Sequence, residues 1–514
     1  MKSMQNKAIA RDGEHVSPWQ VNLEESPSAN AAGTGKLYDC IIVGAGITGL
    51  SAGLMLQKAG KSVLIIDAHN AGFGTTGGTS AHINTFADTT YKEAESAFGE
   101  EGAKLFAGAV NAGFDIIREN IKTYNIECDF EEKPGYVYAE DDEQVKQLND
   151  LYEGTVKVGV QVHYTENLPI PIPFKRALMF DGQAQFHPMK YLHGILQAYL
   201  SAGGSLIENT KIDKIDTSEG IHTAMSGDQS FRANHIIYAT HTPPGINLFS
   251  FRCAPYRSYV IAVKLKGDAY PDALIYDMQD PYHYFRTHEI QGQKLLLIGG
   301  NDHKTGHADP EKAFADLGKY AREHFSVSAI KYKWSSQYYV PVDGLPYVGQ
   351  IPFYAEGIYC ATGYNGNGMM LGSISAQILC SLVTGKKHPY AELLSSTRIK
   401  PIDGFTEFVK ENADVAYHFV ADRLSVHETD SLKRLKPGTG KVVKFDGKTV
   451  AAYRDENGEI HALHAVCTHA ACIVNWNAEE RSWDCPCHGA RYGTDGSVLN
   501  GPAEKNLPKI EFEG

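Results

Sequence analysis

A glycine-rich loop between two apolar segments, within residues 38–67, constrains the fold of this chain more than any other feature. The loop reads GAGITG at 44–49 and follows the run YDCIIV at 38–43. That run is rich in β-branched residues and is typical of a buried parallel strand. A helical pattern continues to Ala59, and a second apolar run, KSVLIID at 61–67, completes the unit. This order predicts a βαβ unit of the kind that binds dinucleotides.

Each glycine of the loop has its own role in such a unit. Gly44 permits the tight turn out of the strand, Gly46 lets the backbone approach a pyrophosphate, and Gly49 allows close helix–strand packing. The start of the helix then offers free N–H groups to the phosphates. Asp67 ends the second strand, where it is placed to accept hydrogen bonds from a ribose. The alternative is a glycine-rich turn without a ligand, and the loop alone does not distinguish FAD from NAD.

A second constraint is a group of cysteines and histidines near the C-terminus. Its pattern is C-x-H, then fifteen residues, then C-x-x-H. This is the spacing of a Rieske [2Fe–2S] centre, in which two thiolates hold one iron and two imidazoles hold the other. The alternative is a Cys2His2 zinc site, but the short C-x-H half-site and the flanking Pro486 and Gly489 argue against it. The predicted iron ligands are Cys467, His469, Cys485 and His488.

Composition and charge exclude several other classes of protein. The formal net charge is −13 and the chain has no basic block, which argues against a nucleic-acid partner. With 43% hydrophobic residues, the chain is not an intrinsically disordered one. No apolar stretch is long enough to span a membrane, and the N-terminus lacks the apolar region of a signal peptide. We therefore expect a soluble, cytoplasmic protein, whose oligomeric state the sequence leaves open.

Four further motifs resemble, in chain order, the D-amino acid oxidase/glycine oxidase superfamily of FAD enzymes. They are GFGTTGGTSAHIN at 72–84, IYATH at 237–241, VDGLPYVG at 342–349 and GYNGNG at 363–368. The resemblance implies FAD, covered by a second glycine loop and approached at its flavin end by a late helix N-terminus, where charge develops on reduction. Together with the first loop, it implies these cofactor-binding residues: Gly44, Ala45, Gly46, Ile47, Thr48, Gly49, Asp67, Gly74, Thr75, Thr76, Thr79, Ala239, Thr240, Gly363, Asn365, Gly366, Gly368 and Met369.

The chain as a whole resembles bacterial FAD-dependent oxidoreductases of this superfamily fused to a C-terminal Rieske domain. The implied fold is an α/β Rossmann-like FAD-binding domain interleaved with an α+β substrate domain of the glutathione-reductase-2/D-amino acid oxidase type, followed by an all-β Rieske domain. The expected divisions are an N-terminal arm at 1–35, the FAD-binding domain at 36–122, 183–250 and 335–398, the substrate domain at 123–182 and 251–334, a connector helix at 399–426, and the Rieske domain at 427–514.

Some relatives in the superfamily bind FAD covalently through a histidine of the second loop, in a motif that resembles G-T-T/S-W-H. This chain has Gly77 and Gly78 where Trp and His would stand, so we expect FAD to be bound non-covalently. His82 is the one local candidate for a covalent link, and a hydrogen-bonded loop histidine is the favoured interpretation.

The cluster region also resembles the Rieske proteins of respiratory and photosynthetic quinol-oxidising complexes. That resemblance implies a disulfide between Cys472 and Cys487, clamping the two cluster loops. Those proteins read C-P-C-H-G-S-x-Y, in which the Ser and Tyr hydroxyls donate hydrogen bonds to sulfur. Here Ala490 replaces the Ser, whereas Tyr492 is kept. Because such hydrogen bonds stabilise the reduced cluster, we expect a potential below that of the quinol-oxidising group.

The resemblance also suggests where a substrate would bind, between the FAD-binding and substrate domains. An Arg of the substrate domain typically binds the substrate carboxylate in this superfamily. Arg286 precedes the strand KLLLIGG as that Arg does, and Tyr256, Arg257 and Tyr259 lie in a matching strand that could line the pocket. The alternative for Arg286 is a surface or interdomain salt bridge. Gln337 and Tyr338 resemble a motif that approaches the flavin.

A mononuclear iron site, as in Rieske oxygenases, has one weak candidate in this sequence. His303 and His307 lie four residues apart, near Asp302 and Asp309. The spacing does not fit a site of two histidines and one carboxylate, so a second metal is not expected.

The function that these features imply is a flavin-dependent dehydrogenase. It would oxidise a small amine or amino acid by hydride transfer to N5 of FAD, with no catalytic base required. Electrons would then pass singly through the cluster to a one-electron acceptor, either a protein or a small redox carrier. Two alternatives remain open: an electron-transfer or redox-sensing protein without amine oxidation, and a reductase in which electrons flow from cluster to flavin.

Overall fold

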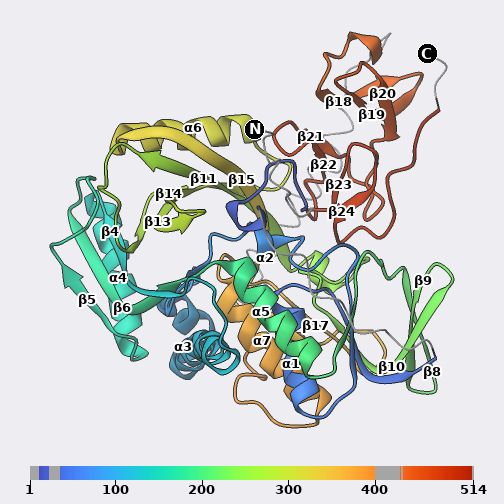
Figure 1. The fold of residues 1–514 in the computed structure, drawn as a ribbon, viewed down its shortest axis with the longest axis horizontal. Coiled ribbons are helices and arrows are strands. Elements are labelled where there is room, and N and C mark those ends of the chain that lie inside the picture. The colour runs from blue at the N-terminus through green and yellow to red at the C-terminus, as the bar shows by residue number, and fades with distance from the viewer. Residues whose placement is uncertain (1–10, 22–34, 400–428, 430–431, 512–514) are drawn as a thin grey trace.

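The computed structural model describes residues 11–21, 35–399, 429 and 432–511 (Figure 1). Two large sheets and their helices form the main body, and the C-terminal residues, orange to red in the picture, form a separate small β region at its upper right. Residues 400–426 of the expected connector helix at 399–426 lie outside the described residues.

The first sheet has eight strands, in the order β16-β17-β10-β1-β2-β7, with β9 on β10 and β8 on β9. Its centre is parallel, as the buried β-branched runs predicted, and the helices α1, α5 and α7 lie side by side against it (Figure 1). The strands are β1 Leu37–Val43, β2 Val63–Ile66, β7 Ser205–Ile207, β8 Lys214–Ser218, β9 Ile221–Ser226, β10 Gln229–Tyr238, β16 Tyr347–Gln350 and β17 Ile358–Thr362. The helices are α1 Ile47–Lys58, α5 Pro188–Ser201 and α7 Gly368–Val383.

The second sheet has nine strands, in the order β15-β11-β14-β13-β12-β4-β6-β3, with β5 on β6. Helix α6 packs on β11 and β14, α4 on β4, and the long α3 connects this part to α7. The strands are β3 His82–Ile83, β4 Glu131–Ala139, β5 Val162–Thr165, β6 Arg176–Gln185, β11 Cys253–Leu265, β12 Leu274–Asp277, β13 His283–Ile290, β14 Gln293–Lys304 and β15 Val327–Pro341. The helices are α2 Thr75–Gly78, α3 Tyr91–Tyr124, α4 Asp142–Lys157 and α6 Pro310–His324.

The C-terminal region is all-β, as expected, and consists of two small antiparallel sheets. Its main core gathers the four cluster-region cysteines with apolar residues such as Trp483 and Leu507. The strands are β18 Thr439–Phe445, β19 Lys448–Arg454, β20 Ile460–His464, β21 Asn475–Asn477, β22 Ser482–Asp484, β23 Arg491–Tyr492 and β24 Val498–Asn500.

The N-terminal segment 11–21 differs from the arm that the sequence suggested, because it packs into the body of the protein. A short 3-10 helix, η1 Pro18–Gln20, contains Trp19, which is fully buried. The Trp19 indole N–H donates to the Thr79 carbonyl at 2.7 Å, and its ring lies 5.0 Å from the Arg286 guanidinium. Aromatic burial of this size stabilises a fold substantially, so this segment is part of the core.

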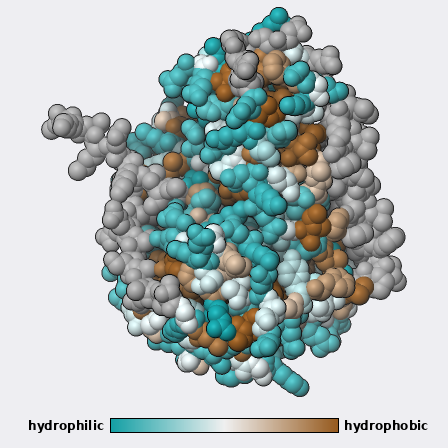
Figure 2. Space-filling view, turned by 90° about the vertical axis from the view of Figure 1, so that its right-hand side faces the viewer, coloured by the Kyte–Doolittle hydropathy of each residue, from teal (hydrophilic) through white to brown (hydrophobic). Residues whose placement is uncertain are grey.

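The surface has no single dominant apolar face in the view of Figure 2. Hydrophobic residues occur there in several separate areas among hydrophilic ones. Over the residues that the structure describes, no helix is both long enough and apolar enough to cross a membrane.

Candidate functional site

A cavity of about 420 Å³ lies where the loops of the eight-stranded sheet meet the nine-stranded sheet. The first glycine loop and Asp67 line one end, and side chains of β12, β13, β14 and β15 line the other. All of the expected cofactor-binding residues line this cavity except Ala45, Gly49 and Gly363. The glycine loop at 44–49 and the loop at 363–368 are far apart in the sequence, and residues of both line this one cavity.

The first glycine loop has the geometry that its roles require. Gly44 has φ +110°, and a Cβ there would lie 2.5 Å from the Ala239 carbonyl oxygen. A Cβ on Gly49 would lie 1.9 Å from the Gly44 carbonyl oxygen, which accounts for this glycine as a packing residue outside the cavity. The Asp67 carboxylate accepts hydrogen bonds from the N–H groups of Ala45, at 2.6 Å, and His69, at 2.8 Å.

Two helix N-termini face the cavity without side-chain caps. Gly46 precedes α1 and Asn367 precedes α7, and neither side chain caps its helix. Residues of both first turns line the cavity, namely Ile47, Thr48, Gly368 and Met369. Uncapped N–H groups at a helix start attract anionic groups, so this arrangement fits a dinucleotide with its pyrophosphate and its reducible ring.

His82, the one candidate for a covalent flavin link, is held by hydrogen bonds on both ring nitrogens. Its Nδ1 lies 3.0 Å from Ser80 Oγ, and its Nε2 lies 3.4 Å from the Phe285 carbonyl oxygen. Burial lowers the pKa of His82 to about 3, so the ring is neutral at physiological pH. These contacts agree with the interpretation of a hydrogen-bonded loop histidine.

The far end of the cavity is lined by tyrosines and one carboxyl that sequence reasoning largely missed. Tyr276, Tyr282 and Tyr284 come from β12, β13 and the turn between them, and Asp302 comes from β14. The signal that could have found them is Gly299, which pairs with Tyr284 across the sheet. A Cβ on Gly299 would lie 1.9 Å from the Tyr284 ring, so the glycine makes room for an inward-facing tyrosine.

The four residues expected to bind substrate lie outside the lining of this cavity. Arg286 follows Tyr284 by two residues on β13, but its guanidinium donates to the carbonyls of Ala81, at 2.5 Å, and Phe186, at 3.2 Å. Trp19 covers it, and Arg286 is fully buried. Backbone carbonyls and an aromatic ring therefore hold this cation, in place of a substrate carboxylate. Burial lowers the pKa of Arg286 to about 9.

The other three positions have structural partners as well. Arg257 is buried and its Nε donates to Ser335 Oγ at 2.8 Å. The Tyr259 ring packs edge-on against Phe314 of α6, on the face of the sheet turned away from the cavity. The Tyr256 ring lies 6.0 Å from that of Tyr338. Alternation along β11 accounts for Arg257 and Tyr259, because the cavity-lining residues of this strand are Ser258 and Val260.

The candidate cluster site is formed by two loops of the C-terminal region, one after β20 and one between β22 and β23. Cys467, His469, Cys485 and His488 are all buried. The His469 and His488 rings lie 4.9 Å apart at 84°, and the Nδ1 atom of each is buried without a hydrogen-bond partner. Unpartnered buried imidazole nitrogens beside two thiols fit the donor set of a [2Fe–2S] Rieske cluster.

Two local features support these loops. Cys472 and Cys487 form a disulfide with an S–S distance of 1.96 Å, which confirms the expected pairing. The Tyr492 hydroxyl lies 3.1 Å from Cys467 Sγ, where it can donate to a ligand sulfur. Hydrogen bonding, first of all from Cys485, lowers the pKa of the Cys467 thiol, which favours a thiolate.

The alternative second metal site does not assemble. His307 Nε2 lies 3.0 Å from the Pro486 carbonyl oxygen, and Asp309 caps α6. Asp302 instead accepts a hydrogen bond from the Tyr338 hydroxyl at 2.8 Å. Within the described ranges, neither His303 nor His307 belongs to a group of three or more ligand atoms close enough to hold one metal ion.

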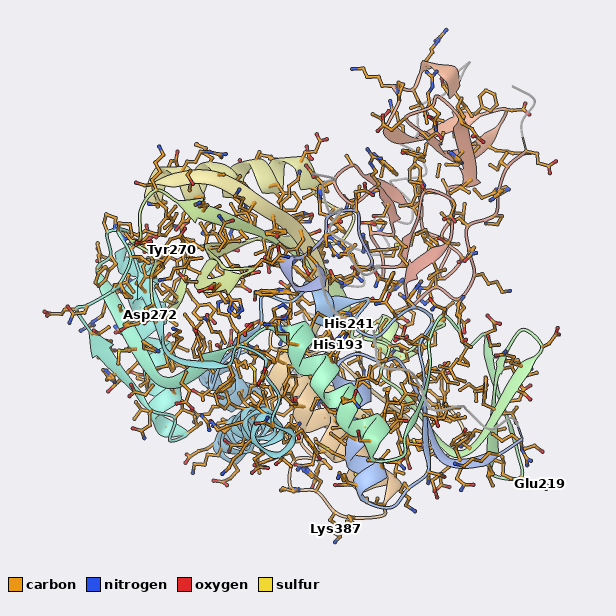
Figure 3. All side chains as sticks on the ribbon, viewed as in Figure 1. His193, Glu219, His241, Tyr270, Asp272 and Lys387 are labelled. Atoms are coloured by element: carbon orange, nitrogen blue, oxygen red, sulfur yellow. A yellow bond between two sulfur atoms is a disulfide. The ribbon has the colours of Figure 1, made fainter. Side chains whose placement is uncertain are left out.

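The cluster site contacts the cavity walls directly. His469 Nε2 lies 3.3 Å from the Gly245 carbonyl oxygen, and the Gln337 amide donates to the Gly489 carbonyl at 3.0 Å. Gln337 and His241 both line the cavity, and residues 497–501 of the C-terminal region line it too. Figure 3 shows His241 near the middle of the molecule, away from the edges marked by Glu219 and Lys387. The two candidate cofactor sites are therefore neighbours.

A buried network of charges joins the C-terminal region to the body. Glu480 accepts hydrogen bonds from the Ser335 backbone and hydroxyl, and lies 3.6 Å from Arg257 and 4.0 Å from Arg11. Arg491 lies 3.4 Å from Asp12 of the N-terminal segment. All of these side chains are buried, and all except that of Ser335 are charged. The stability of each buried charge therefore depends on its partners.

The hydrogen bonds to the ligand sulfurs lead to a prediction about redox potential. We expect Ala490→Ser to raise the midpoint potential of the cluster and Tyr492→Phe to lower it, because each hydroxyl donor stabilises the reduced state. A hydrogen bond to a charged group contributes about 1.5–3 kcal/mol, which corresponds to roughly 60–130 mV for one electron. An EPR-monitored redox titration measures both shifts, and an unchanged potential in the Ala490→Ser protein contradicts the explanation.

Comparison with known proteins agrees with both candidate sites. The family model described as FAD dependent oxidoreductase matches residues 39–382, and the model described as Rieske [2Fe-2S] domain matches 425–511. A protein of Bacillus subtilis (strain 168), named "Putative Rieske 2Fe-2S iron-sulfur protein YhfW", is 32% identical over 99% of this chain and 100% of its own length. The order of the two domains is therefore found in another chain of the same extent.

Other relatives match a smaller share of the chain. The gamma-glutamylputrescine oxidoreductase of Escherichia coli (strain K12) is 23% identical, over 76% of this chain and 93% of its own length. The crystal structure of glycine oxidase from Geobacillus kaustophilus superimposes with a TM-score of 0.59 at 19% identity, covering 70% of this chain and 99% of that one. This last likeness is one of fold.

Proposed function

This chain belongs to the FAD dependent oxidoreductase family and carries a C-terminal Rieske [2Fe-2S] domain, and we propose that it is a dehydrogenase for a small amine or amino acid. Electrons from the substrate pass through the Rieske cluster, held by Cys467, His469, Cys485 and His488, to an external one-electron acceptor. FAD, bound non-covalently along the cavity, supplies the two-electron step by accepting hydride from the substrate.

The observation that carries this proposal is the position of the cluster loops against the cavity wall. Gln337 lines the cavity and donates to the Gly489 carbonyl, next to the ligand His488. The Tyr339 hydroxyl lies 3.5 Å from the His488 carbonyl oxygen, and its ring is 4.7 Å from that of His241, another lining residue. A one-electron centre built into the wall of a hydride-accepting site favours transfer between the two over direct reaction with oxygen.

The buried setting of the cluster supports transfer to and from the cavity as well. His469 and His488 are 9% and 4% exposed, respectively. Residues of the flavin part cover both rings: His469 Nε2 lies 3.3 Å from the Gly245 carbonyl oxygen, and the Phe251 ring lies 5.8 Å from the His488 ring. The position of these imidazoles against the flavin part supports electron exchange between the cluster and the cavity.

The role of the chain's own residues is mainly to bind and orient. Oxidation of R–CH2–NH2 transfers a hydride from carbon and leaves the iminium ion R–CH=NH2⁺, which water hydrolyses to an aldehyde and ammonium. The tyrosine-lined end holds the reacting carbon in place and limits the access of water, and such positioning contributes much of the rate in reactions of this type. The α7 N-terminus, which has no side-chain cap, would stabilise negative charge on a reduced flavin bound in the cavity.

An anaerobic titration of the purified holoprotein with amines and amino acids tests the function. We expect a substrate to bleach the flavin absorption and then to produce the EPR signal of the reduced cluster, because the flavin is reduced first and the cluster lies next to it. If no amine or amino acid bleaches the flavin while dithionite reduces both centres, the amine dehydrogenase is refuted. The chain is then an electron-transfer protein.

A further inference from the structure

The tyrosine-lined end of the cavity contains one carboxylate oxygen without a partner. The Tyr338 hydroxyl donates to Asp302 Oδ2 at 2.8 Å, whereas Asp302 Oδ1 is buried and has no partner within hydrogen-bond geometry. The Ser258 hydroxyl lies near this carboxylate and pairs with the Tyr284 hydroxyl at 3.0 Å. Both residues line the cavity, together with Tyr276, Tyr282 and Tyr284. A buried acceptor without a donor is costly, so its position in a cavity wall indicates a donor on a bound ligand.

The charges around this end have one sign. Asp88 also lines the cavity and accepts a hydrogen bond from the Gly366 N–H at 2.7 Å. Among the lining residues that the structure describes, Lys211 is the only lysine or arginine. Lys211 follows Thr210, whose N–H donates to the Asp67 carbonyl at 2.9 Å, so Lys211 lies at the Asp67 end of the cavity, opposite Asp302. Arg286 is held elsewhere by two carbonyls.

We propose that Asp302 binds the ammonium group of the substrate, and that the substrate is a cationic amine without a carboxylate on its reacting carbon. This inference rests on the proposed function and narrows its substrate class. A carboxylate at this end would meet Asp302 and Asp88 with no cation to pair with, and like charges at short range are strongly unfavourable in a buried site. An alkylammonium group instead satisfies Asp302 Oδ1.

The tyrosines support the same class of ligand. Aromatic faces attract cations, by about 0.5–2 kcal/mol for each well-placed ring, and their apolar edges accommodate an alkyl chain. Burial raises the pKa of Asp302 to about 7, because its effect outweighs that of the Ser258 and Tyr338 hydroxyls, which favour the ionised carboxylate. A carboxyl that titrates near neutral pH can also accept the proton that an ammonium ion must lose before its carbon can donate hydride. The proton moves from the ammonium nitrogen to Asp302 Oδ1. The C–H bond then breaks, its electron pair leaves with the hydride, and the nitrogen lone pair forms the C=N bond of the iminium ion.

The test compares amines with the amino acids from which they differ by one carboxylate. The pairs are putrescine with ornithine, cadaverine with lysine, and phenethylamine with phenylalanine. Anaerobic flavin bleaching in the holoprotein gives a rate and a dissociation constant for each compound. We expect the amine of a reactive pair to reduce the flavin at least 10-fold more efficiently than its amino acid. The opposite order overturns the inference but leaves the dehydrogenase intact.

Variants separate the role of Asp302 from a structural effect. We expect Asp302→Asn to weaken amine binding by roughly 10- to 150-fold, the range for losing a hydrogen bond to a charged group. Asp302→Glu keeps the charge and is expected to retain the preference for amines. Asp228→Asn makes the same chemical change at an exposed residue of the hairpin between β9 and β10, and is expected to have no effect. Flavin and cluster spectra report whether each variant has kept its cofactors.

If no compound bleaches the flavin, the proposed function is refuted. The inference about Asp302 is then tested separately, by measuring ligand binding. Perturbation of the flavin spectrum by cadaverine or phenethylamine measures binding without turnover. Binding that Asp302→Asn abolishes supports the ammonium site. Equal binding in the Asp302→Asn protein, or binding of lysine in preference to cadaverine, overturns it.

Discussion

Replacing Cys485 with serine is expected to abolish the [2Fe–2S] cluster and, with it, turnover with a one-electron acceptor. A serine hydroxyl is a poor substitute for a thiolate on iron, and Cys485 is one of only two thiolate ligands in the proposed set. Amine-dependent bleaching of the flavin should survive, because the cavity walls near Asp302 belong to other strands. We expect the rate of cytochrome c reduction to fall about 100-fold or more, since linked sites gain a factor of about that size from tethering.

A matched cysteine variant shows whether this loss is specific. Cys380 lies on α7, is partly exposed and is far in sequence from the cluster loops. The Cys380→Ser protein should keep both the EPR signal and the turnover rate. If Cys485→Ser retains the cluster signal, the ligand assignment is wrong; if it loses the signal but keeps full turnover, electrons do not pass through the cluster.

The second large effect is expected at Glu480, the buried carboxylate between the C-terminal region and the body. Glu480→Gln removes the carboxylate that pairs with Arg257 at 3.6 Å and lies 4.0 Å from Arg11, and breaking a buried ion pair costs about 3–5 kcal/mol. We expect Glu480→Gln to lower the midpoint temperature of thermal unfolding, measured by the visible circular dichroism of the cluster. We also expect slower electron transfer from flavin to cluster. The reason is that Glu480 also accepts hydrogen bonds from Ser335 of β15, which holds the two regions in contact.

The adjacent residue offers a control with the same chemical change. Glu479 contacts Lys333 and His15 at a more exposed position, with 15% of its side chain accessible. Exposed pairs contribute about 0–1 kcal/mol, so Glu479→Gln should change the midpoint little. Equal effects at the two positions contradict the role given to the buried network.

The same carboxylate leads to a specific dependence of stability on pH. Burial alone raises the pKa of Glu480, but Arg11, Arg257 and Arg491 outweigh it and hold the pKa at about 2, against 4.5 for an ordinary Glu. A depressed pKa in the folded state stabilises the protein fully above 4.5, and that stabilisation is lost as the pH falls toward 2. Wild type should therefore lose stability over this window, and Glu480→Gln should lose less.

Much of the cofactor chemistry could be predicted from the sequence, because its signals are local. The turn at Gly44, the packing at Gly49 and the half-sites of Cys467 and Cys485 each depend on residues close together in the chain. The disulfide between Cys472 and Cys487 was expected from resemblance and is present. The cofactor loops consequently line one cavity almost as expected, with Gly363 among the few exceptions.

The substrate end was harder to predict, because its residues come from different strands of one sheet. Tyr276, Tyr338 and Asp302 lie on β12, β15 and β14, and only their register across the sheet brings them to the same cavity. Arg286 matched its expected position in sequence, yet Trp19 covers its guanidinium. No local pattern around Arg286 could reveal that a residue so distant in the chain would occupy that place.

The two cofactor classes, the parallel core of the first sheet and the all-β character of the C-terminal region follow from local sequence patterns. Turn geometry, ligand spacing and strand periodicity operate over short stretches of chain, so they can be deduced without the fold. Three further features became visible in the folded chain alone: Arg286 lies outside the cavity lining, Asp302 lines the cavity, and the cluster loops contact its wall through Gln337. These three features depend on contacts between segments that are distant in the sequence. Such contacts are set by the shapes and charges of surfaces that exist only after the chain has folded.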